Sequence, residues 1–256
     1  MHNNIKQNSY SRYADNRDVI SLFSGAMGLD IGLSKAGLNV VIGQDFDAAC
    51  VNAMRANGHK VLGGDIREIQ PQQLLDMTGL SVGETFLICG GPPCQPFFTA
   101  GKRLGINDPR GSLFMDFIRI IDYIRHRFFV MENVKGIMSA PLKHVPLSER
   151  DERDPNQRLG TVLDVILSEF DKLGYKTVYG VLDAVNYGVP QFRERFVLIG
   201  SRDNEDIFLP IPTHFLLNTW ELCQKNMLLI TRRVIIEQPI DWLESLPIAF
   251  VEKTEV

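Results

Sequence analysis

Residues 86–103 have the sequence FLICGGPPCQPFFTAGKR, and the rest of the chain can be interpreted outward from this stretch. The apolar run at 86–89 is typical of a buried strand, and the sequence GGPP at 90–93 ends it. Cys94 therefore follows on a loop just beyond the strand. In α/β proteins the functional groups gather at the carboxyl ends of parallel strands. Cys94 is a candidate nucleophile, with the alternative that it is a small buried hydrophobic residue.

The composition suits one globular α/β domain. The chain has 256 residues, of which 45% are hydrophobic and 23% charged, enough for a full core. Its four cysteines (Cys50, Cys89, Cys94 and Cys223) form no CxxC pair, so we expect no metal site, no disulfide framework and a cytoplasmic location. No apolar run approaches the roughly 18 residues of a membrane span. The polar N-terminus lacks the apolar core of a signal peptide.

The charge of the chain gives no overall basic character. Its net charge is −4 and its pI is near 5.8. A protein that binds nucleic acid usually carries a basic surface. If this chain acts on DNA, its basic surface is local, or much of the surface that holds the DNA lies elsewhere.

The first unit of the chain is a strand, a glycine turn and a helix, at residues 19–23, 24–28 and 29–36. This is how a nucleotide-binding α/β fold begins, because the glycines let a ligand approach the backbone closely. The alternative is a simple tight turn. A second strand, at residues 40–45, ends on Asp45, about 20 residues after the turn, where such folds bind a ribose. Phe46 could stack on an adenine, or it could be a core aromatic beside a surface acid.

Asp65 follows a short third strand at residues 60–62 and is a second candidate ligand contact. The alternative is that Asp65 caps a helix, since residues 66–75 are a possible helix and Asp is a good N-cap. The rest of the chain continues to alternate between predicted helices and predicted strands. We expect helices at 48–57, 112–126 and 159–174, strands at 128–131, 177–182 and 196–200, and a surface loop at 139–157.

Glu132 follows the strand at 128–131, on the same edge of the sheet as Cys94. Two chemically capable groups on neighbouring strand ends are what an active site needs. Gln191, Arg193 and Arg195 alternate ahead of the last strand, so their side chains share one face if the segment is extended. Two arginines and an amide suit an anionic partner. The alternative for these three residues is a solvated charged edge.

Four motifs occur in order along the chain: FSG at 23–25, PCQPF at 93–97, ENV at 132–134 and QFRER at 191–195. Together they resemble the DNA (cytosine-5)-methyltransferases of bacterial restriction–modification systems. The resemblance implies an α/β, class I S-adenosylmethionine-dependent methyltransferase (Rossmann-like) fold, a mostly parallel sheet with helices on both faces. It also implies an N-terminal arm at 1–18, a catalytic domain at 19–214 and an atypical tail at 215–256.

The resemblance implies a covalent mechanism on a cytosine flipped out of double-stranded DNA. Attack of the Cys94 thiolate on C6 would let C5 take the methyl group. Glu132 would hold and protonate N3, Arg195 would bind the base carbonyl, and Arg193 would orient the site or the phosphate backbone. The further substrate-binding residues implied are Gln95, Asn133, Val134 and Gln191. A nucleoid-associated location would follow from the DNA substrate.

The cofactor implied by the resemblance is S-adenosylmethionine. Its methionine end would lie against Phe23, Gly25 and Gly28. Asp45 would hold the ribose hydroxyls, and Phe46 would stack on the adenine. Asp65 would accept from the adenine amine. The remaining cofactor-binding positions implied are Ile66 and Pro92.

The chain departs from the family at several positions. Met27 stands where a further glycine is common, Asp45 replaces the usual Glu, and Phe98 replaces a serine that contacts nucleic acid. Residues 215–256 show no complete target-recognition domain and no closing glycine–asparagine motif. We therefore expect weak methylation by this chain alone, with a possible second chain supplying recognition. The alternatives are a tRNA cytosine-5 methyltransferase and a non-catalytic remnant or subunit.

Overall fold

The computed structural model describes residues 16–93, 112–142, 145, 151 and 153–214. The expectations for Cys94, Gln95 and Phe98, for most of the N-terminal arm and for residues 215–256 therefore lie outside the described residues. In the part that is described, no helix is long and apolar enough to cross a membrane. The same residues contain no group of three or more His, Cys, Asp or Glu side chains that could hold a metal ion.

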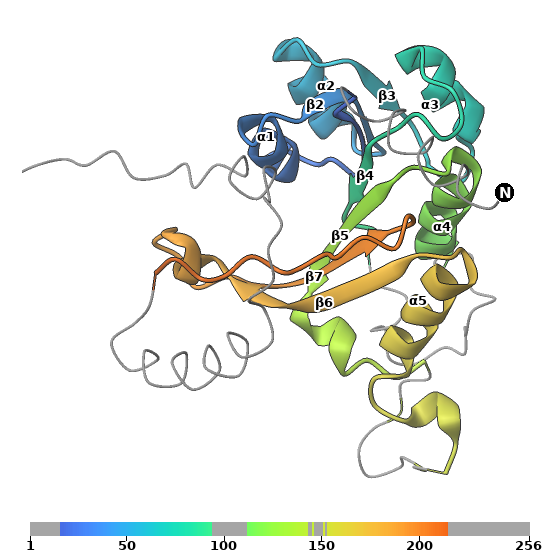
Figure 1. The fold of residues 1–256 in the computed structure, drawn as a ribbon, viewed down its shortest axis with the longest axis vertical. Helices are drawn as coiled ribbons and strands as arrows, with labels where there is room; N and C mark the ends of the chain where they lie inside the picture. The colour runs from blue at the N-terminus through green and yellow to red at the C-terminus, as the bar shows by residue number, and fades with distance from the viewer. Residues whose placement is uncertain (1–15, 94–111, 143–144, 146–150, 152, 215–256) are drawn as a thin grey trace, which may run out of the picture.

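The fold is built on one seven-stranded sheet with the order β3-β2-β1-β4-β5-β7-β6. Its strands are β1 (Asp18–Leu22), β2 (Asn39–Asp45), β3 (Val61–Gly63), β4 (Leu87–Gly90), β5 (Phe128–Val134), β6 (Lys176–Asp183) and β7 (Glu194–Ser201). The strands β1 to β5 pair in parallel, and β7 runs antiparallel to both of its neighbours. Figure 1 shows β7 and β6 continuing the sheet beyond β5. The mostly parallel sheet expected from the sequence is confirmed.

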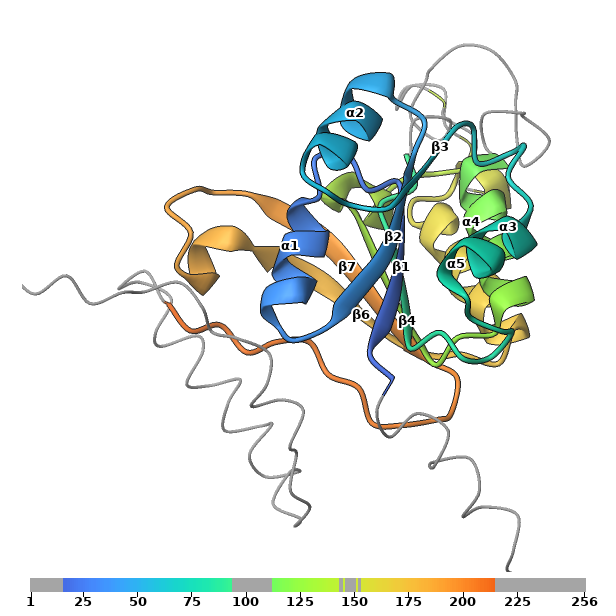
Figure 2. The same cartoon turned by 90° about the horizontal axis from the view of Figure 1, so that it is seen from above.

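Helices cover both faces of this sheet (Figure 2). They are α1 (Gly28–Lys35), α2 (Ala48–Ala56), α3 (Pro71–Thr78), α4 (Ser112–Ile124) and α5 (Thr161–Lys172), with short 3-10 helices η3 (Lys135–Met138), η5 (Pro155–Gln157) and η6 (Ala184–Tyr187). The helices α3, α4 and α5 lie on one side, and α1 and α2 on the other. The strand order reverses between β1 and β4, which is the point where open α/β sheets bind ligands.

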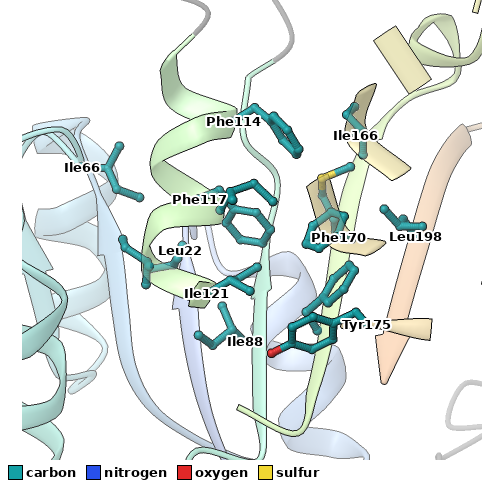
Figure 3. Packing of buried hydrophobic residues seen from close by; sticks show 14 of the residues in the cluster. Leu22, Ile66, Ile88, Phe114, Phe117, Ile121, Ile166, Phe170, Tyr175 and Leu198 are labelled. Atoms are coloured by element: carbon teal, nitrogen blue, oxygen red, sulfur yellow. The ribbon is translucent and has the colours of Figure 1, made fainter. Parts of the chain in front are cut away.

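The largest apolar core lies between the sheet and α3, α4 and α5 (Figure 3). Phe117 and Ile121 lie one turn apart on α4 and are fully buried. Phe170 of α5 stacks on Phe129 of β5 with ring centroids 3.9 Å apart. Each buried side chain of this size contributes roughly 1.5–3 kcal/mol. This packing fixes the two strands, β4 and β5, whose ends lead to the candidate site.

Two local expectations from the sequence are wrong. Residues 66–68 form a turn, and α3 begins only at Pro71, because Gln70 forms a capping box with Gln73 and Pro71 suits the first helical position. Asp65 is therefore not a helix cap. In addition, β5 extends to Val134, since its pairing with β7 continues through Glu132 and beyond. Glu132 thus lies inside the end of the strand rather than after it.

Gly200 on β7 provides a test of the core. A Cβ at Gly200 would overlap the ring of Phe129, which is fully buried and held against Phe170. We expect Gly200→Ala to lower the free energy of unfolding by about 1–3 kcal/mol, measured by urea denaturation.

Gly32→Ala in α1 is the matched control for Gly200→Ala. No heavy atom lies within 4 Å of a Cβ at Gly32 outside the helix's own backbone, so we expect this change to stabilise the protein. The gain should be about 0.5–1 kcal/mol. Equal urea midpoints for Gly200→Ala and the unchanged chain would contradict the packing described for β5 and β7.

Candidate active site

The turn between β1 and α1 is fixed from the end of β2. The backbone N–H of Gly25 donates to Asp45 Oδ2 at 2.7 Å, and that of Ser24 donates to the Gln44 carbonyl at 2.9 Å. Gly25 has a φ of +54°, a conformation that favours glycine. A Cβ at Gly25 or Gly28 would meet no heavy atom within 4 Å, so the space beside the turn is open. Phe23 packs against the main core, with its ring 6.5 Å from that of Phe117.

Met27 also has a left-handed backbone, with φ +62°. This explains why a glycine suits the position, since methionine adopts that conformation at some energetic cost. The Met27 side chain is buried in a cluster with Val51, Met54 and Val61, below α2. The apolar packing offsets the backbone cost. The departure from the family pattern is therefore accommodated by packing on the side away from the open turn.

Asp45 has hydrogen-bond partners on both carboxylate oxygens. Oδ2 accepts from Gly25, and Oδ1 accepts from the Asp47 backbone N–H at 2.8 Å. A carboxylate offers about four acceptor positions, so Asp45 can still accept from two hydroxyls. Phe46 beside it has 74% of its surface exposed, which makes its ring available to a planar ligand. Asp47 caps α2, and hydrogen bonds from the backbone N–H groups of Cys50 and Ala49 lower its pKa.

Asp65 lies in the turn after β3. It pairs with Arg67, whose Nε donates to Oδ1 at 2.9 Å, and this pairing lowers the pKa of Asp65. Asp65 is therefore a carboxylate at neutral pH and can accept from an amine. The side chain of Ile66 is buried in the main core, so only its backbone could meet a ligand. Gln44 Nε2 donates to the Gly64 carbonyl at 2.8 Å and ties the turn to β2.

Asn133 fixes the chain just before position 94. Its Nδ2 donates to the carbonyl of Pro92 at 2.9 Å, and its Oδ1 accepts from the Val134 backbone N–H at 2.9 Å. Asn133 is only 8% exposed, whereas Val134 lies exposed at the strand end. A Cβ at Gly91 would come within 3.3 Å of Glu132 Oε2, so a glycine lets the chain pass close to the acid. Asn133 therefore positions the strand end rather than presenting its amide to solvent.

Glu132 and Arg195 form an ion pair at the ends of β5 and β7. Arg195 Nε lies 2.7 Å from Glu132 Oε1, and both side chains are partly exposed. In the antiparallel register Glu132 is opposite Val197, so Arg195 is its diagonal neighbour. Arg195 also donates from Nη1 to the Glu194 carbonyl at 2.8 Å. Glu132 and Arg195, the two residues expected from the sequence to bind the cytosine, are thus in direct contact.

Gln191 and Arg193 are not on the strand with Arg195. The strand β7 begins at Glu194. The Arg193 backbone N–H donates to the side-chain Oδ1 of Asp183 at 2.8 Å, while the Arg193 carbonyl accepts from the Ala184 backbone N–H at 3.2 Å. The expected extended face of three side chains is therefore wrong for Gln191 and Arg193, which are exposed before the strand. Sequence analysis also missed the ion pair of Lys135 with Glu194, which joins the same two strand ends at 2.8 Å.

The two groups of residues lie on one edge of the sheet. Phe23, Gly25, Asp45, Phe46 and Asp65 follow or end β1, β2 and β3, and Pro92, Glu132 and Asn133 follow or end β4 and β5. β1 and β4 are paired neighbours, with Leu22 opposite Gly90, so the two groups are adjacent at the reversal of strand order. Open α/β sheets bind their ligands at such a reversal.

A family model of C-5 cytosine-specific DNA methylases matches residues 17–229. The chain belongs to this family. It is 38% identical over 208 residues to the type II methyltransferase M.AquIA of Picosynechococcus, covering 77% of each chain. It is 37% identical over 190 residues to the type II methyltransferase M.FnuDI of Fusobacterium nucleatum, covering 74% of this chain but only 48% of that relative.

Solved structures carry the same fold as this C-5 cytosine-specific DNA methylase. A crystal structure of a Spodoptera frugiperda DNMT2 mutant aligns with a TM-score of 0.56 at 23% identity, covering 78% of this chain and 57% of that one. The Entamoeba histolytica methyltransferase EhMeth aligns with a TM-score of 0.55 at 19% identity, over 78% of this chain and 57% of that one. The Rossmann-like methyltransferase fold expected from the sequence is confirmed.

Asn133→Asp tests the contact that positions the end of β4. The change replaces the donor by a carboxylate facing the Pro92 carbonyl, so a buried acceptor loses its partner. We expect the free energy of unfolding at pH 8 to fall by about 1–3 kcal/mol in urea denaturation. Asn57→Asp changes an exposed amide–carbonyl contact with Ala53 and should cost less than about 1 kcal/mol. An equal loss of unfolding free energy in the two variants would show that the Asn133–Pro92 contact stabilises the fold no more than the exposed Asn57 contact does.

Proposed function

We propose that this chain transfers a methyl group from S-adenosylmethionine to C5 of a cytosine in double-stranded DNA, within a restriction–modification system. The observation that carries the proposal is the Glu132–Arg195 pair on the strand beside the one that leads to Cys94. Membership in the C-5 cytosine-specific DNA methylase family supports the reaction class. It also favours DNA over tRNA as the substrate. The domain boundaries, the second chain and the nucleoid-associated cytoplasmic location stay predictions from the sequence.

The residues at the ends of β1, β2 and β3 fit S-adenosylmethionine. Open space lies beside Gly25 and Gly28, where a Cβ would intrude on a bound ligand. We assign Phe23 and these glycines to the methionine end, with Pro92 just after the neighbouring strand β4. When bound, the cofactor supplies an electrophilic methyl group. Holding it in one orientation is the contribution of the glycine turn.

The other end of the cofactor suits the carboxylates of β2 and the turn after β3. Asp45 has acceptor positions left for the ribose hydroxyls, and the exposed ring of Phe46 can stack on the adenine. The ionised Asp65 can accept from the adenine amine, beside the backbone of Ile66. The remaining alternative is a non-catalytic remnant or subunit, and a cofactor site with these three contacts favours the enzyme over it.

The chemical step uses a cytosine that has left the duplex. The Cys94 thiolate forms a bond to C6, and the electron pair of the C5–C6 double bond moves into the ring. Glu132 provides a proton at N3, while Arg195 holds the base carbonyl as negative charge develops. C5 takes the methyl group, the electron pair of the broken sulfur–methyl bond stays on the cofactor sulfur, and the N3 proton returns to Glu132. A base then removes the C5 proton, its electron pair re-forms the C5–C6 double bond, and the bond from C6 to sulfur breaks to release the Cys94 thiolate.

Polar residues around the reacting groups have separate tasks in this proposal. Arg195 bonds one oxygen of Glu132, so the second oxygen can face the base. Arg193 and Gln191 are exposed beside it, where they can meet the phosphate backbone. We assign Gln95 and Val134 to contacts with the base, as the resemblance to the family implies, and Asn133 keeps the strand end in place.

Covalent trapping tests the nucleophile. With S-adenosylmethionine and any partner chain that the reaction needs, duplex DNA carrying 5-fluorocytosine should give a stable protein–DNA complex with the unchanged chain. After methyl transfer, C5 carries fluorine in place of the proton that a base must remove. We expect Cys94→Ala to give no such complex on a denaturing gel. Cys50→Ala removes a second free thiol on α2, away from the ends of β4 and β5, and should trap as well as the unchanged chain. Trapping by Cys94→Ala would overturn the assignment.

Calorimetric titration with S-adenosylmethionine tests the ribose contact. Asp45→Ala removes a charged acceptor and the partner of the Gly25 N–H. We expect the affinity to fall by about 10- to 150-fold, from the loss of roughly 1.5–3 kcal/mol. Asp47→Asn, two residues on, changes a cap of α2 and should leave the dissociation constant unchanged. An unaltered constant for Asp45→Ala would mean that Asp45 is only a structural acid.

A further inference from the structure

Arg119 on α4 holds the turn that follows β3. Its Nη2 donates to the Ile66 carbonyl at 2.8 Å, and its Nη1 donates to the Ile69 carbonyl at 3.0 Å. Its Nε donates to Asp116 Oδ1, one helical turn earlier, at 3.1 Å. The planar guanidinium therefore spans two carbonyls while a carboxylate on its own helix fixes its orientation. Helical periodicity gave no reason to single out this arginine in the sequence.

The turn held by Arg119 is also anchored by the Ile66 and Ile69 side chains, which are buried in the main core. It follows β3, which has only three residues and lies at the edge of the sheet, paired with β2 alone. On the side of β2, Gln44 donates to the Gly64 carbonyl, and the Gly64 backbone N–H donates to the Asp45 carbonyl at 3.0 Å. On the side of α4, Arg119 bonds the two carbonyls. A short edge strand needs such contacts if the residues after it are to keep one position.

We propose that Arg119 is a positioning residue for the adenine end of the cofactor, an inference that rests on the proposed function. By fixing the carbonyls of Ile66 and Ile69, it fixes the segment that carries the Asp65 carboxylate. Arg67 then orients that carboxylate within the fixed segment. A cofactor that meets a preformed acceptor loses less free energy to ordering the protein than one that must fix the turn itself.

The packing of α4 does not depend on Arg119, so the positioning of the turn by Arg119 can be tested apart from the stability of the fold. The helix is held on the sheet by fully buried apolar residues, among them Phe117, Ile120 and Ile121. The Arg119 side chain is 36% exposed, so water can reach the carbonyls that it leaves when it is removed. Loss of Arg119 should therefore affect the position of the turn more than the stability of the fold.

Arg119→Gln is the decisive variant. We expect its affinity for S-adenosylmethionine, measured by calorimetry, to fall about tenfold, as loss of the hydrogen bonds that order the turn implies. S-adenosylhomocysteine and 5′-methylthioadenosine share the adenine end and should lose the same factor. The melting temperature of the ligand-free protein should change little. Arg119→Lys keeps the charge and one donor, so its affinity should lie between those of Arg119→Gln and the unchanged chain.

Two matched variants test whether a loss of affinity comes from the turn after β3 or from a change in the packing or the charge of α4. Tyr123→Phe breaks the contact of α4 with α3, where the Tyr123 hydroxyl donates to Gln72 Oε1 at 2.8 Å, but leaves the Ile66 carbonyl untouched. Arg125→Gln removes the same charge just after the end of α4, where Arg125 pairs with Asp122 of that helix. Both should bind S-adenosylmethionine as the unchanged chain does.

The outcomes separate the two proposals. Equal affinities for Arg119→Gln and the unchanged chain would overturn the role of Arg119 and leave the proposed function standing. An equal loss in Tyr123→Phe would also overturn it, since the effect would then belong to the packing of α4. Failure of the unchanged chain to bind S-adenosylmethionine would instead contradict the proposed function.

Discussion

The close contact of β1 with β4 is the constraint on which the site depends. A Cβ at Gly90 would lie 2.6 Å from the Leu22 carbonyl oxygen and 3.0 Å from the ring of Phe117. A side chain at this position would push β4 away from β1, from α4, or from both. The glycine turn after β1 and the chain that leads to Cys94 after β4 would then separate. The adjacency of the residues proposed for the cofactor and those proposed for the substrate therefore depends on Gly90 having no side chain.

The reversed direction of β7 has an equally direct consequence. In a parallel strand the residue nearest the site would be the last, but β7 runs antiparallel to β5 and brings its first residues there. Arg195 can therefore reach Glu132 from the start of β7, and Lys135 can reach Glu194. The last two strands contribute charge to an edge that β1 to β5 build from glycine turns and acids. If β7 ran parallel to β5, Arg195 would lie at the opposite edge of the sheet.

The elements that could be predicted from sequence are those set by local pattern. Short apolar runs predicted β1, β2, β4 and β5, and the order of four motifs indicated the family. The helix expected at 66–75 was wrong, because the Gln70 capping box and Pro71 delay α3. The Asn133–Pro92 contact and the Arg119 contacts link residues 41, 50 and 53 positions apart, which periodicity cannot reveal. Gln191 and Arg193 do not share a strand with Arg195, because the Arg193 N–H bonds the Asp183 side chain and β7 begins at Glu194.

The contacts that hold the site share one physical feature, since each is a hydrogen bond between a side chain and the backbone of a segment that follows a strand. Asp45 holds the Gly25 N–H, Gln44 holds the Gly64 carbonyl, Arg119 holds the Ile66 carbonyl and Asn133 holds the Pro92 carbonyl. Each joins a turn at a strand end to a neighbouring element. Backbone fixed in this way presents its binding groups at a constant position, and of these four side chains only Asp45 is also proposed to meet the ligand. The shorter Asp45 fits this arrangement, because its carboxylate lies 2.7 Å from the turn while its remaining acceptor positions are free for a ligand.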